Sequence, residues 1–332
     1  MLATEPTTYQ DRIDNEINFY KDCEQVHQLP DIFHYWSNRY LLPKFQPHGF
    51  NSPDDFFIQQ VLQHLSQHPT QDPFQLLSIG AGNGESELLL ADALVKQGIR
   101  HFTITCLDIN PHMLQRCQEN AAAKGLGAQI ATECGDFNVW EANQTFDVVL
   151  ANQCLHHVIN LEHLLATVEL ALKPTGVFLV SDMIGRNGHQ RWPEALTLLK
   201  PIWEGMPDRL KHNRLLQRFE PEYINHDCST SGFEGIRAQD ILPMLVERFH
   251  FDMFIPFANL IMVLIDRPFG HNFQVDDPAD LALIDRVHEI DEQAILKGTI
   301  KPTQMVACLS KQPKHTVLTR PELTPEFCIR WP

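Results

Sequence analysis

The sequence predicts an α/β fold built on a mostly parallel sheet. Two observations lead to this prediction. Short β-rich runs alternate with amphipathic helical stretches from about residue 75 onward, and the first of these runs ends in three closely spaced glycines. Such alternation is typical of βαβ units, in which helices pack on the faces of a parallel sheet. The chain has 332 residues, 43% of them hydrophobic, which suffices for one large decorated domain or two average ones.

The first strand and its loop lie in residues 76–85, which read Leu-Leu-Ser-Ile-Gly-Ala-Gly-Asn-Gly-Glu. The apolar start predicts a buried strand, and Gly80, Gly82 and Gly84 predict a tight loop before a helix. Glycine adopts positive φ and lets a ligand approach the backbone. The N–H groups of the following helix start favour an anionic group such as a carboxylate. Because Glu85 stands where a dinucleotide fingerprint needs its third glycine, the spacing argues against a nicotinamide site.

Six further strands are expected, and helical patterns separate them. They cover residues 101–107, 128–134, 146–151, 177–180, 251–254 and 304–309. With the first strand they predict a doubly wound, mostly parallel sheet of seven strands. Ligands on such a sheet bind beyond the carboxyl ends of the strands. We therefore expect Gly80, Asp108, Asp136 and Asn152 to face one crevice.

Segments outside this series suggest a division of the chain. We expect an N-terminal helical lid segment at 1–70, a cofactor-binding core at 71–184, an inserted helical cap at 185–235, the end of the core at 236–310 with a second insertion at about 259–298, and an extended tail at 311–332. Residues 9–28 predict a polar helix. The aromatic cluster at 33–40 has two interpretations, which are helix packing and a lid over the cofactor or substrate.

The amino-acid composition limits the classes of molecule that the protein is expected to bind. The net charge of −16 disfavours a nucleic-acid or anionic-membrane surface, since those usually need a basic patch. Eight cysteines without any C-x-x-C pair suggest neither a disulfide framework nor a zinc cluster. The chain shows no signal-peptide pattern and no apolar run of membrane-spanning length. We expect a cytoplasmic protein with a small-molecule partner, and no pattern predicts its oligomeric state.

The ordered series of motifs from residue 78 to 182 resembles the core of class I S-adenosylmethionine (SAM)-dependent methyltransferases. It comprises the glycine loop, Asp108, the turn Gly135-Asp136-Phe137, and Asn152-Gln153-Cys154-Leu155-His156-His157 after strand four. Residues 155–158 and 172–176 are similar to the small-molecule branch, and residues 182–193 resemble an uncharacterised bacterial subgroup. The resemblance implies a Rossmann-like fold, SAM as methyl donor and S-adenosylhomocysteine as product.

The resemblance also implies a set of cofactor contacts. The expected cofactor-binding residues are Gly80, Ala81, Gly82, Gly84, Glu85, Asp108, Ile109, Asp136, Phe137, Asn152 and Gln153. Asp108 would accept hydrogen bonds from the ribose hydroxyls, and Asp136 with Phe137 would contact the adenine amino group and one ring face. The alternative for both aspartates is a purely structural role in a turn. The family usually has an acidic residue at the position of Ser78, where it helps to hold the methionine amino group. Glu85 is the candidate replacement.

Methyl transfer from a sulfonium is an in-line displacement, so the main contribution of the protein is to align the methyl donor with the acceptor atom. A hydroxyl acceptor would benefit from a base, and His157 and His189, which follow strands four and five, are the catalytic candidates. No metal site is expected, since no ligand cluster surrounds Asp182 in the sequence.

We therefore predict a SAM-dependent methyltransferase acting on a hydroxyl of a secondary metabolite or sugar-type compound. The Asn/Asp-Pro-Pro-Tyr/Phe motif of amino-methylating enzymes is absent, which disfavours a nucleobase amine. The alternatives are a SAM-binding protein without methyl transfer and, less favoured by the glycine spacing, an NAD-dependent oxidoreductase.

Overall fold

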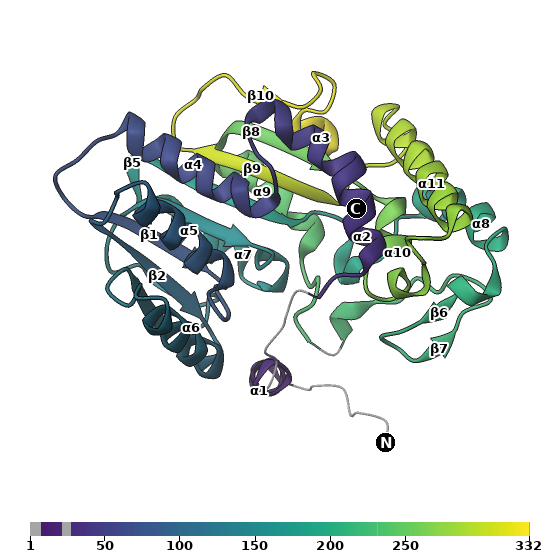
Figure 1. The fold of residues 1–332 in the computed structure, drawn as a ribbon, viewed down its shortest axis with the longest axis horizontal. Coiled ribbons are helices and arrows are strands. Elements are labelled where there is room, and N and C mark those ends of the chain that lie inside the picture. Colours follow the sequence, from purple (N-terminus) through teal and green to yellow (C-terminus); the bar gives the residue numbers. More distant parts are fainter. Residues whose placement is uncertain (1–7, 22–27, 231, 332) are drawn as a thin grey trace.

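A computed structural model describes residues 8–21, 28–230 and 232–331. Its centre is an eight-stranded sheet in the order β10-β8-β9-β5-β4-β1-β2-β3, with helices packed against it (Figure 1). The strands are β1 (Phe74–Ile79), β2 (Phe102–Asp108), β3 (Ile130–Cys134), β4 (Phe146–Asn152), β5 (Leu172–Met183), β8 (His250–Phe257), β9 (Gln304–Ser310) and β10 (Val317–Leu318). Only β9 runs antiparallel to its neighbours, β5 and β8. The predicted Rossmann-like, mostly parallel α/β fold is therefore confirmed.

The helices alternate with the strands through the core, as the sequence pattern predicts. The described helices are α1 (Tyr9–Tyr20), α2 (Asp31–Trp36), α3 (Leu42–Phe45), α4 (Pro53–Gln67), α5 (Glu85–Lys96), α6 (Pro111–Ala123), α7 (Leu161–Ala171), α8 (Pro193–Glu204), α9 (Ala238–Arg248), α10 (Leu260–Ile265), α11 (Pro278–Leu296) and α12 (Pro325–Cys328). Asn110 caps α6, its side chain accepting hydrogen bonds from the backbone N–H groups of His112 and Met113.

The expected number of seven strands is wrong by one. The additional strand, β10, lies in the tail, where Val317 and Leu318 pair in parallel with Met253 and Phe254 of β8. A pairing of two residues at the edge of a sheet leaves no hydrophobic alternation to detect in the sequence. The tail is thus partly tied to the sheet edge.

The first insertion differs from its expected form, whereas the second consists mainly of helices α10 and α11. The segment 185–235 contains α8 but also a two-stranded antiparallel sheet, β6 (His212–Asn213) and β7 (Arg218–Phe219), so it is not wholly helical. In the second insertion, the buried Asp291 of α11 accepts hydrogen bonds from the backbone N–H groups of Asn259 and Leu260 at 2.9 and 2.8 Å. Asp291 thereby satisfies donors at the start of α10, which a helix leaves unpaired.

The aromatic cluster at 33–40 packs against α11. The indole of Trp36, 1% exposed, donates a hydrogen bond to Nδ1 of His288, and the ring of Tyr40 stacks on the same histidine. The Tyr35 hydroxyl donates to Asp285 at 2.9 Å. These contacts favour the helix-packing interpretation of the cluster.

The carboxyl ends of the central strands meet at one edge of the sheet. Ile79 of β1 pairs with Leu107 of β2 and with Ala151 of β4, so the residues after these strands are neighbours. Helix α1 lies near this edge in Figure 1; its expected continuation over residues 22–27 falls outside the described residues. Within the described part of the chain, no helix is both long and apolar enough to cross a membrane.

Candidate functional site

A cleft opens at the carboxyl ends of β1, β2 and β4. It has an empty volume of about 850 Å³, which includes the solvent at its open mouth. Its lining residues come from α1, the glycine loop, α5, α6, the ends of β2 and β4, and the turns after β2, β3 and β4: Glu16, Tyr20, Gly80, Ala81, Gly82, Asn83, Glu85, Ser86, Glu87, Asp108, Ile109, Asn110, Met113, Phe137, Asn152, Gln153, Cys154 and His157. Most of the predicted cofactor residues are thus brought together.

The glycine loop lies directly against the end of β4. Gly80 has a φ of +69°, and a Cβ there would sit 2.4 Å from Cβ of Cys154. Its N–H donates to the carbonyl of Leu107 at 2.8 Å, which holds the loop against β2. Gly84, with a φ of +75°, begins α5 and would place a Cβ 2.3 Å from Sγ of Cys117. Gly84 is therefore needed for packing against α6 and is not part of the cleft lining.

Asp108 fixes the loop to the end of β2. Its side chain is 8% exposed, and its two oxygens accept the N–H groups of Gly82 and Asn110, both at 2.8 Å. Burial raises the pKa of Asp108, and these two hydrogen bonds oppose the rise. Each carboxylate oxygen has a further lone pair. Asp108 can therefore still accept hydrogen bonds from hydroxyls of a ligand in the cleft.

A second buried carboxyl group, that of Glu87, lies behind the loop, and no pattern in the sequence indicates it. The Ser78 hydroxyl donates to Oε1 of Glu87 at 2.6 Å. Glu87 is 6% exposed yet lines the cleft, and burial raises its pKa to about 7 against the opposing Ser78 hydrogen bond. Glu85 also lines the cleft but is exposed. Glu87 thus places a carboxyl group of α5 in the cleft beside Ser78.

Helix α1 forms part of the cleft wall. Arg116 of α6 donates to the carbonyls of Tyr20 and Lys21 and, through Nε, to the side chain of Asn83. Asn110 donates to the carbonyl of Ile17 at 3.1 Å. These bonds hold α1 against the glycine loop and the turn after β2, and they bring Glu16 and Tyr20 to the cleft.

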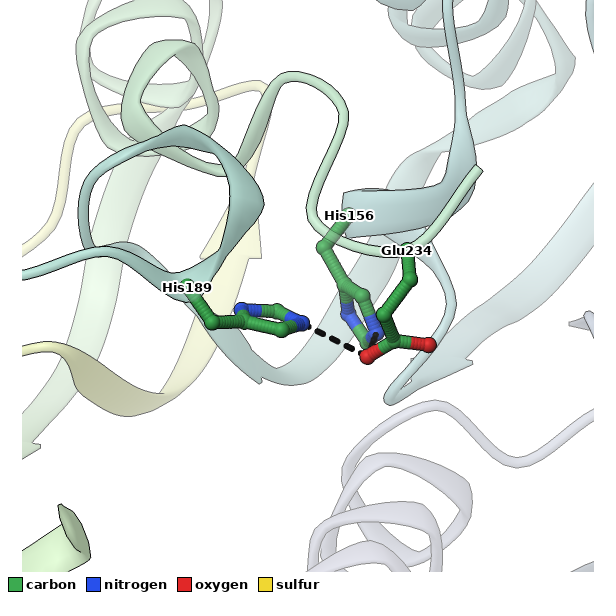
Figure 2. A group of neighbouring side chains, drawn as sticks. All are labelled: His156, His189 and Glu234. Atoms are coloured by element: carbon green, nitrogen blue, oxygen red, sulfur yellow. Dashed lines mark hydrogen bonds and ion pairs between the residues drawn. The ribbon is translucent and has the colours of Figure 1, made fainter. Parts of the chain in front are cut away.

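A cluster of histidines and carboxylates follows β4 and β5 (Figure 2). His189 Nε2 lies 2.6 Å from Oε1 of Glu234, and His156 Nε2 lies 3.6 Å from the same oxygen. On its other side, His156 Nδ1 is 2.6 Å from Oδ1 of the fully buried Asp182. His157 lies between two carboxylates, with Nε2 3.4 Å from Glu234 and Nδ1 3.2 Å from Glu16. His157 therefore joins the cluster to the cleft.

The cluster shifts the pKa values of its members strongly. Burial disfavours the charged form of His156, but Asp182 and Glu234 outweigh burial and raise its pKa to about 10. For Glu234, burial is likewise outweighed, because the hydrogen bonds and charge of the histidines hold its pKa well below the usual range. Burial lowers the pKa of His189. The site thus concentrates charge beside the cleft.

Three predicted site residues lie outside the cleft lining. Gly84 packs against α6, as described above. Asp136 accepts hydrogen bonds from the Tyr9 hydroxyl at 2.8 and 2.9 Å and from the backbone of Asn138, and His189 lies behind His156 with Glu234. The sequence shows no cluster of metal ligands near Asp182, whereas the structure brings His156, His189 and Glu234 together there. These residues come from distant segments with no characteristic spacing, so no sequence pattern indicates the cluster.

Comparison with known proteins places the chain in a family. The family model described as "Methyltransferase domain" matches residues 71–255, more than half of the chain. The chain belongs to this methyltransferase family. The membership confirms the resemblance noted in the sequence and makes SAM the cofactor of the domain.

Curated relatives match only in part. A ubiquinone biosynthesis O-methyltransferase of Methylobacterium nodulans is 29% identical over 141 residues, covering 41% of this chain and 53% of that protein. The protein of the same description from Rickettsia akari is 25% identical, covering 49% and 60%. The chain thus spans little more than half the length of these relatives. A solved O-methyltransferase from a polyketide synthase multienzyme of Brevibacillus brevis, in complex with S-adenosylhomocysteine, is 15% identical and covers 92% of this chain and 88% of that one, with a TM-score of 0.46.

The residues of this methyltransferase cleft fit the cofactor. Asp108 keeps acceptor capacity for a ribose diol, and the loop offers backbone where side chains are absent. Glu87 is a buried carboxyl group that forms no ion pair with the described residues, so it suits a cationic group such as the methionine ammonium.

Because Gly80 lies so close to Cys154, even a methyl side chain at position 80 should destabilise the fold strongly. We expect Gly80→Ala to lower the free energy of unfolding by more than about 3 kcal/mol, because left-handed strain of roughly 1–3 kcal/mol adds to the clash with Cys154. Gly98→Ala is the matched control, since Gly98 also has a positive φ, +83°, but open space around it. Urea unfolding of both variants measures the difference. Equal losses would show that the contact with β4 does not constrain the loop.

Proposed function

We propose that this methyltransferase moves the methyl group of SAM to a hydroxyl group of a small molecule, of secondary-metabolite or sugar type. The observation that carries the proposal is the position of His157, which lines the cofactor cleft beside Asn152, Gln153 and Cys154 and is flanked by Glu16 and Glu234. A histidine that lies near two carboxylates at the cofactor cleft is suited to take a proton from a hydroxyl. The descriptions of the curated relatives as O-methyltransferases support the same chemistry.

In this proposal the donor lies along the glycine loop. Asp108 accepts hydrogen bonds from the ribose hydroxyls, Phe137 contacts the adenine, and Glu87 takes the methionine ammonium in place of the usual acid at Ser78. Asp136 already accepts the Tyr9 hydroxyl and would address the adenine amino group through a remaining lone pair. SAM supplies an electrophilic methyl group on its sulfonium.

At the acceptor, His157 removes the hydroxyl proton as the carbon–oxygen bond forms and the carbon–sulfur bond breaks. With a proton on Nδ1, on the side of Glu16, the receiving atom is Nε2, and Glu234 stabilises the imidazolium that results. The products are a methyl ether, S-adenosylhomocysteine and a proton. Helix α1 and the insertions at 185–235 and 259–298 would enclose the acceptor away from water.

The Glu87 assignment predicts an effect that depends on the amino-acid part of the ligand. We expect Glu87→Gln to weaken SAM binding by roughly 10- to 100-fold, the equivalent of a lost charge-assisted hydrogen bond. Binding of 5′-methylthioadenosine, which lacks the amino-acid part, should not change. Calorimetric titration measures both, and Glu85→Gln, an exposed neighbour in the same cleft, is the control.

The same assignment fixes the sign of a pH effect. Because the pKa of Glu87 is raised to about 7, its ionised form is lost as the pH falls through 7, and SAM affinity should fall with it in the wild type but not in Glu87→Gln. The Glu87 assignment fails if the substitution weakens SAM and 5′-methylthioadenosine equally, or neither, or if Glu85→Gln has the larger effect.

The role of His157 predicts a loss of rate with intact donor binding. An acceptor is first found by incubating the protein and SAM with hydroxylated, amino and carbon-nucleophile small molecules and measuring S-adenosylhomocysteine by mass spectrometry. On that acceptor, His157→Gln should lower kcat by about 10²- to 10⁴-fold. His163→Gln, whose ring contacts the carbonyl of Trp140 away from the cleft, should keep the full rate.

Two results would contradict the proposed reaction. Saturable SAM binding without S-adenosylhomocysteine formation across all acceptor classes would favour a SAM-binding protein that does not transfer methyl groups. Methylation confined to nitrogen or carbon acceptors, or a full rate in His157→Gln, would remove the hydroxyl-specific role of that histidine.

A further inference from the structure

Three metal-ligating side chains converge beside the cofactor cleft from separate parts of the chain. His156 lies in the turn after β4, His189 in the turn after β5, and Glu234 in the loop before α9. Figure 2 shows both imidazoles directed at the Glu234 carboxylate. One ligand atom from each residue lies within 4.8 Å of the other two. Ligands bound to zinc at 2.0–2.1 Å are separated by about 3.4 Å in a tetrahedron, so the three atoms need to move only slightly.

The orientation of His156 is fixed from behind. Asp182 Oδ1 holds Nδ1 at 2.6 Å, while Oδ2 accepts the backbone N–H groups of Cys154 at 3.0 Å and Leu155 at 2.7 Å. This contact fixes the ring of His156 so that Nε2 is directed toward Glu234. Carboxylate–histidine pairs of this kind orient the imidazoles of metal sites and raise their basicity.

The loop that carries Glu234 is joined to the turn that carries His189 through the backbone. The N–H of Gly188 donates to the carbonyl of Gly235 at 2.8 Å. A Cβ at Gly235 would lie 2.9 Å from Cε1 of His189, so only glycine permits this approach. The pairing of His189 with Glu234 is thus built by the backbone as well as by the side chains.

The arrangement of charge favours a cation between the three groups. Asp182 and Glu234 face the cluster directly and Glu16 faces it through His157, whereas the nearby guanidinium of Arg191 donates to the backbone carbonyl of His189. The Nε2 atoms of His189 and His156 lie 2.6 and 3.6 Å from the same Glu234 oxygen, so two imidazoles and one carboxylate are directed at a common point. This is the arrangement in which the three groups can share one divalent ion.

We propose that His156, His189 and Glu234 bind a divalent transition-metal ion, with zinc as the best match. Two imidazoles and one carboxylate form the ligand set of catalytic zinc sites, which leave a position open for an oxygen atom. His157 contacts the other oxygen of Glu234 at 3.4 Å and lines the cleft. If the proposed function holds, the open position lies beside the base that deprotonates the acceptor, and the ion would lower the pKa of the bound hydroxyl.

The test measures zinc binding without SAM or any acceptor. Chelator-stripped protein in a thiol-free reductant is titrated with Zn²⁺ by calorimetry, and one-to-one binding with a micromolar or tighter Kd is expected. His189→Ala and Glu234→Gln should weaken it by at least 100-fold, and Asp182→Asn, which acts behind His156, by about 10- to 100-fold. His163→Ala and Cys134→Ser, a histidine and an exposed cysteine outside the cluster, are the controls.

X-ray absorption spectroscopy of the zinc-loaded wild type identifies the ligand atoms directly, so the test does not depend on whether a variant folds. Nitrogen and oxygen neighbours at about 2.0–2.1 Å, without sulfur, are expected. Absence of one-to-one binding in the wild type, unchanged binding in folded His189→Ala and Glu234→Gln, or sulfur ligands would overturn the metal site. SAM titration of the same samples reports on the donor cleft separately, so loss of one site is distinguishable from loss of the other.

Discussion

The contact of the glycine loop with the end of β4 is the constraint on which the site depends. Gly80 can lie against Cys154 only because it lacks a Cβ and adopts a positive φ. That approach places the loop between the ends of β2 and β4, where Asp108 bonds to the N–H of Gly82. The cofactor cleft, the turn that carries His157 and the start of α5 are all positioned from this point.

Buried carboxyl groups surround the loop and give the cleft its electrostatic character. Asp108 and Glu87 are both nearly inaccessible to solvent, and burial raises the pKa of each. Groups of this kind are costly to bury unless a partner compensates them. A ligand that carries a ribose diol at one end and an ammonium at the other supplies such partners. The hydrogen bond from Ser78 to Glu87 holds a carboxyl group of α5 in the cleft beside the end of β1.

The features of the site that local sequence patterns indicate are the ones that could be predicted. The strand ends at Gly80, Asp108 and Asn152 were identified because alternation and glycine spacing are local, and the parallel sheet then brings them together. Glu87 was missed because its role depends on a contact with Ser78 across the start of α5. The cluster of His156, His189 and Glu234 was missed because only the turns after β4 and β5 and the loop before α9 bring these residues together. Strand β10 was missed because it consists of two edge residues.

Methyl transfer in the proposed cleft depends first of all on binding of SAM. Wild-type protein and Asp108→Asn are titrated by calorimetry with SAM, S-adenosylhomocysteine and NAD⁺. We expect saturable one-to-one binding of the first two ligands with Kd on the order of micromolar, weakened by roughly 10- to 100-fold in Asp108→Asn, and no binding of NAD⁺. Binding of NAD⁺ alone, or of none of the three to folded, ligand-free protein, would contradict it.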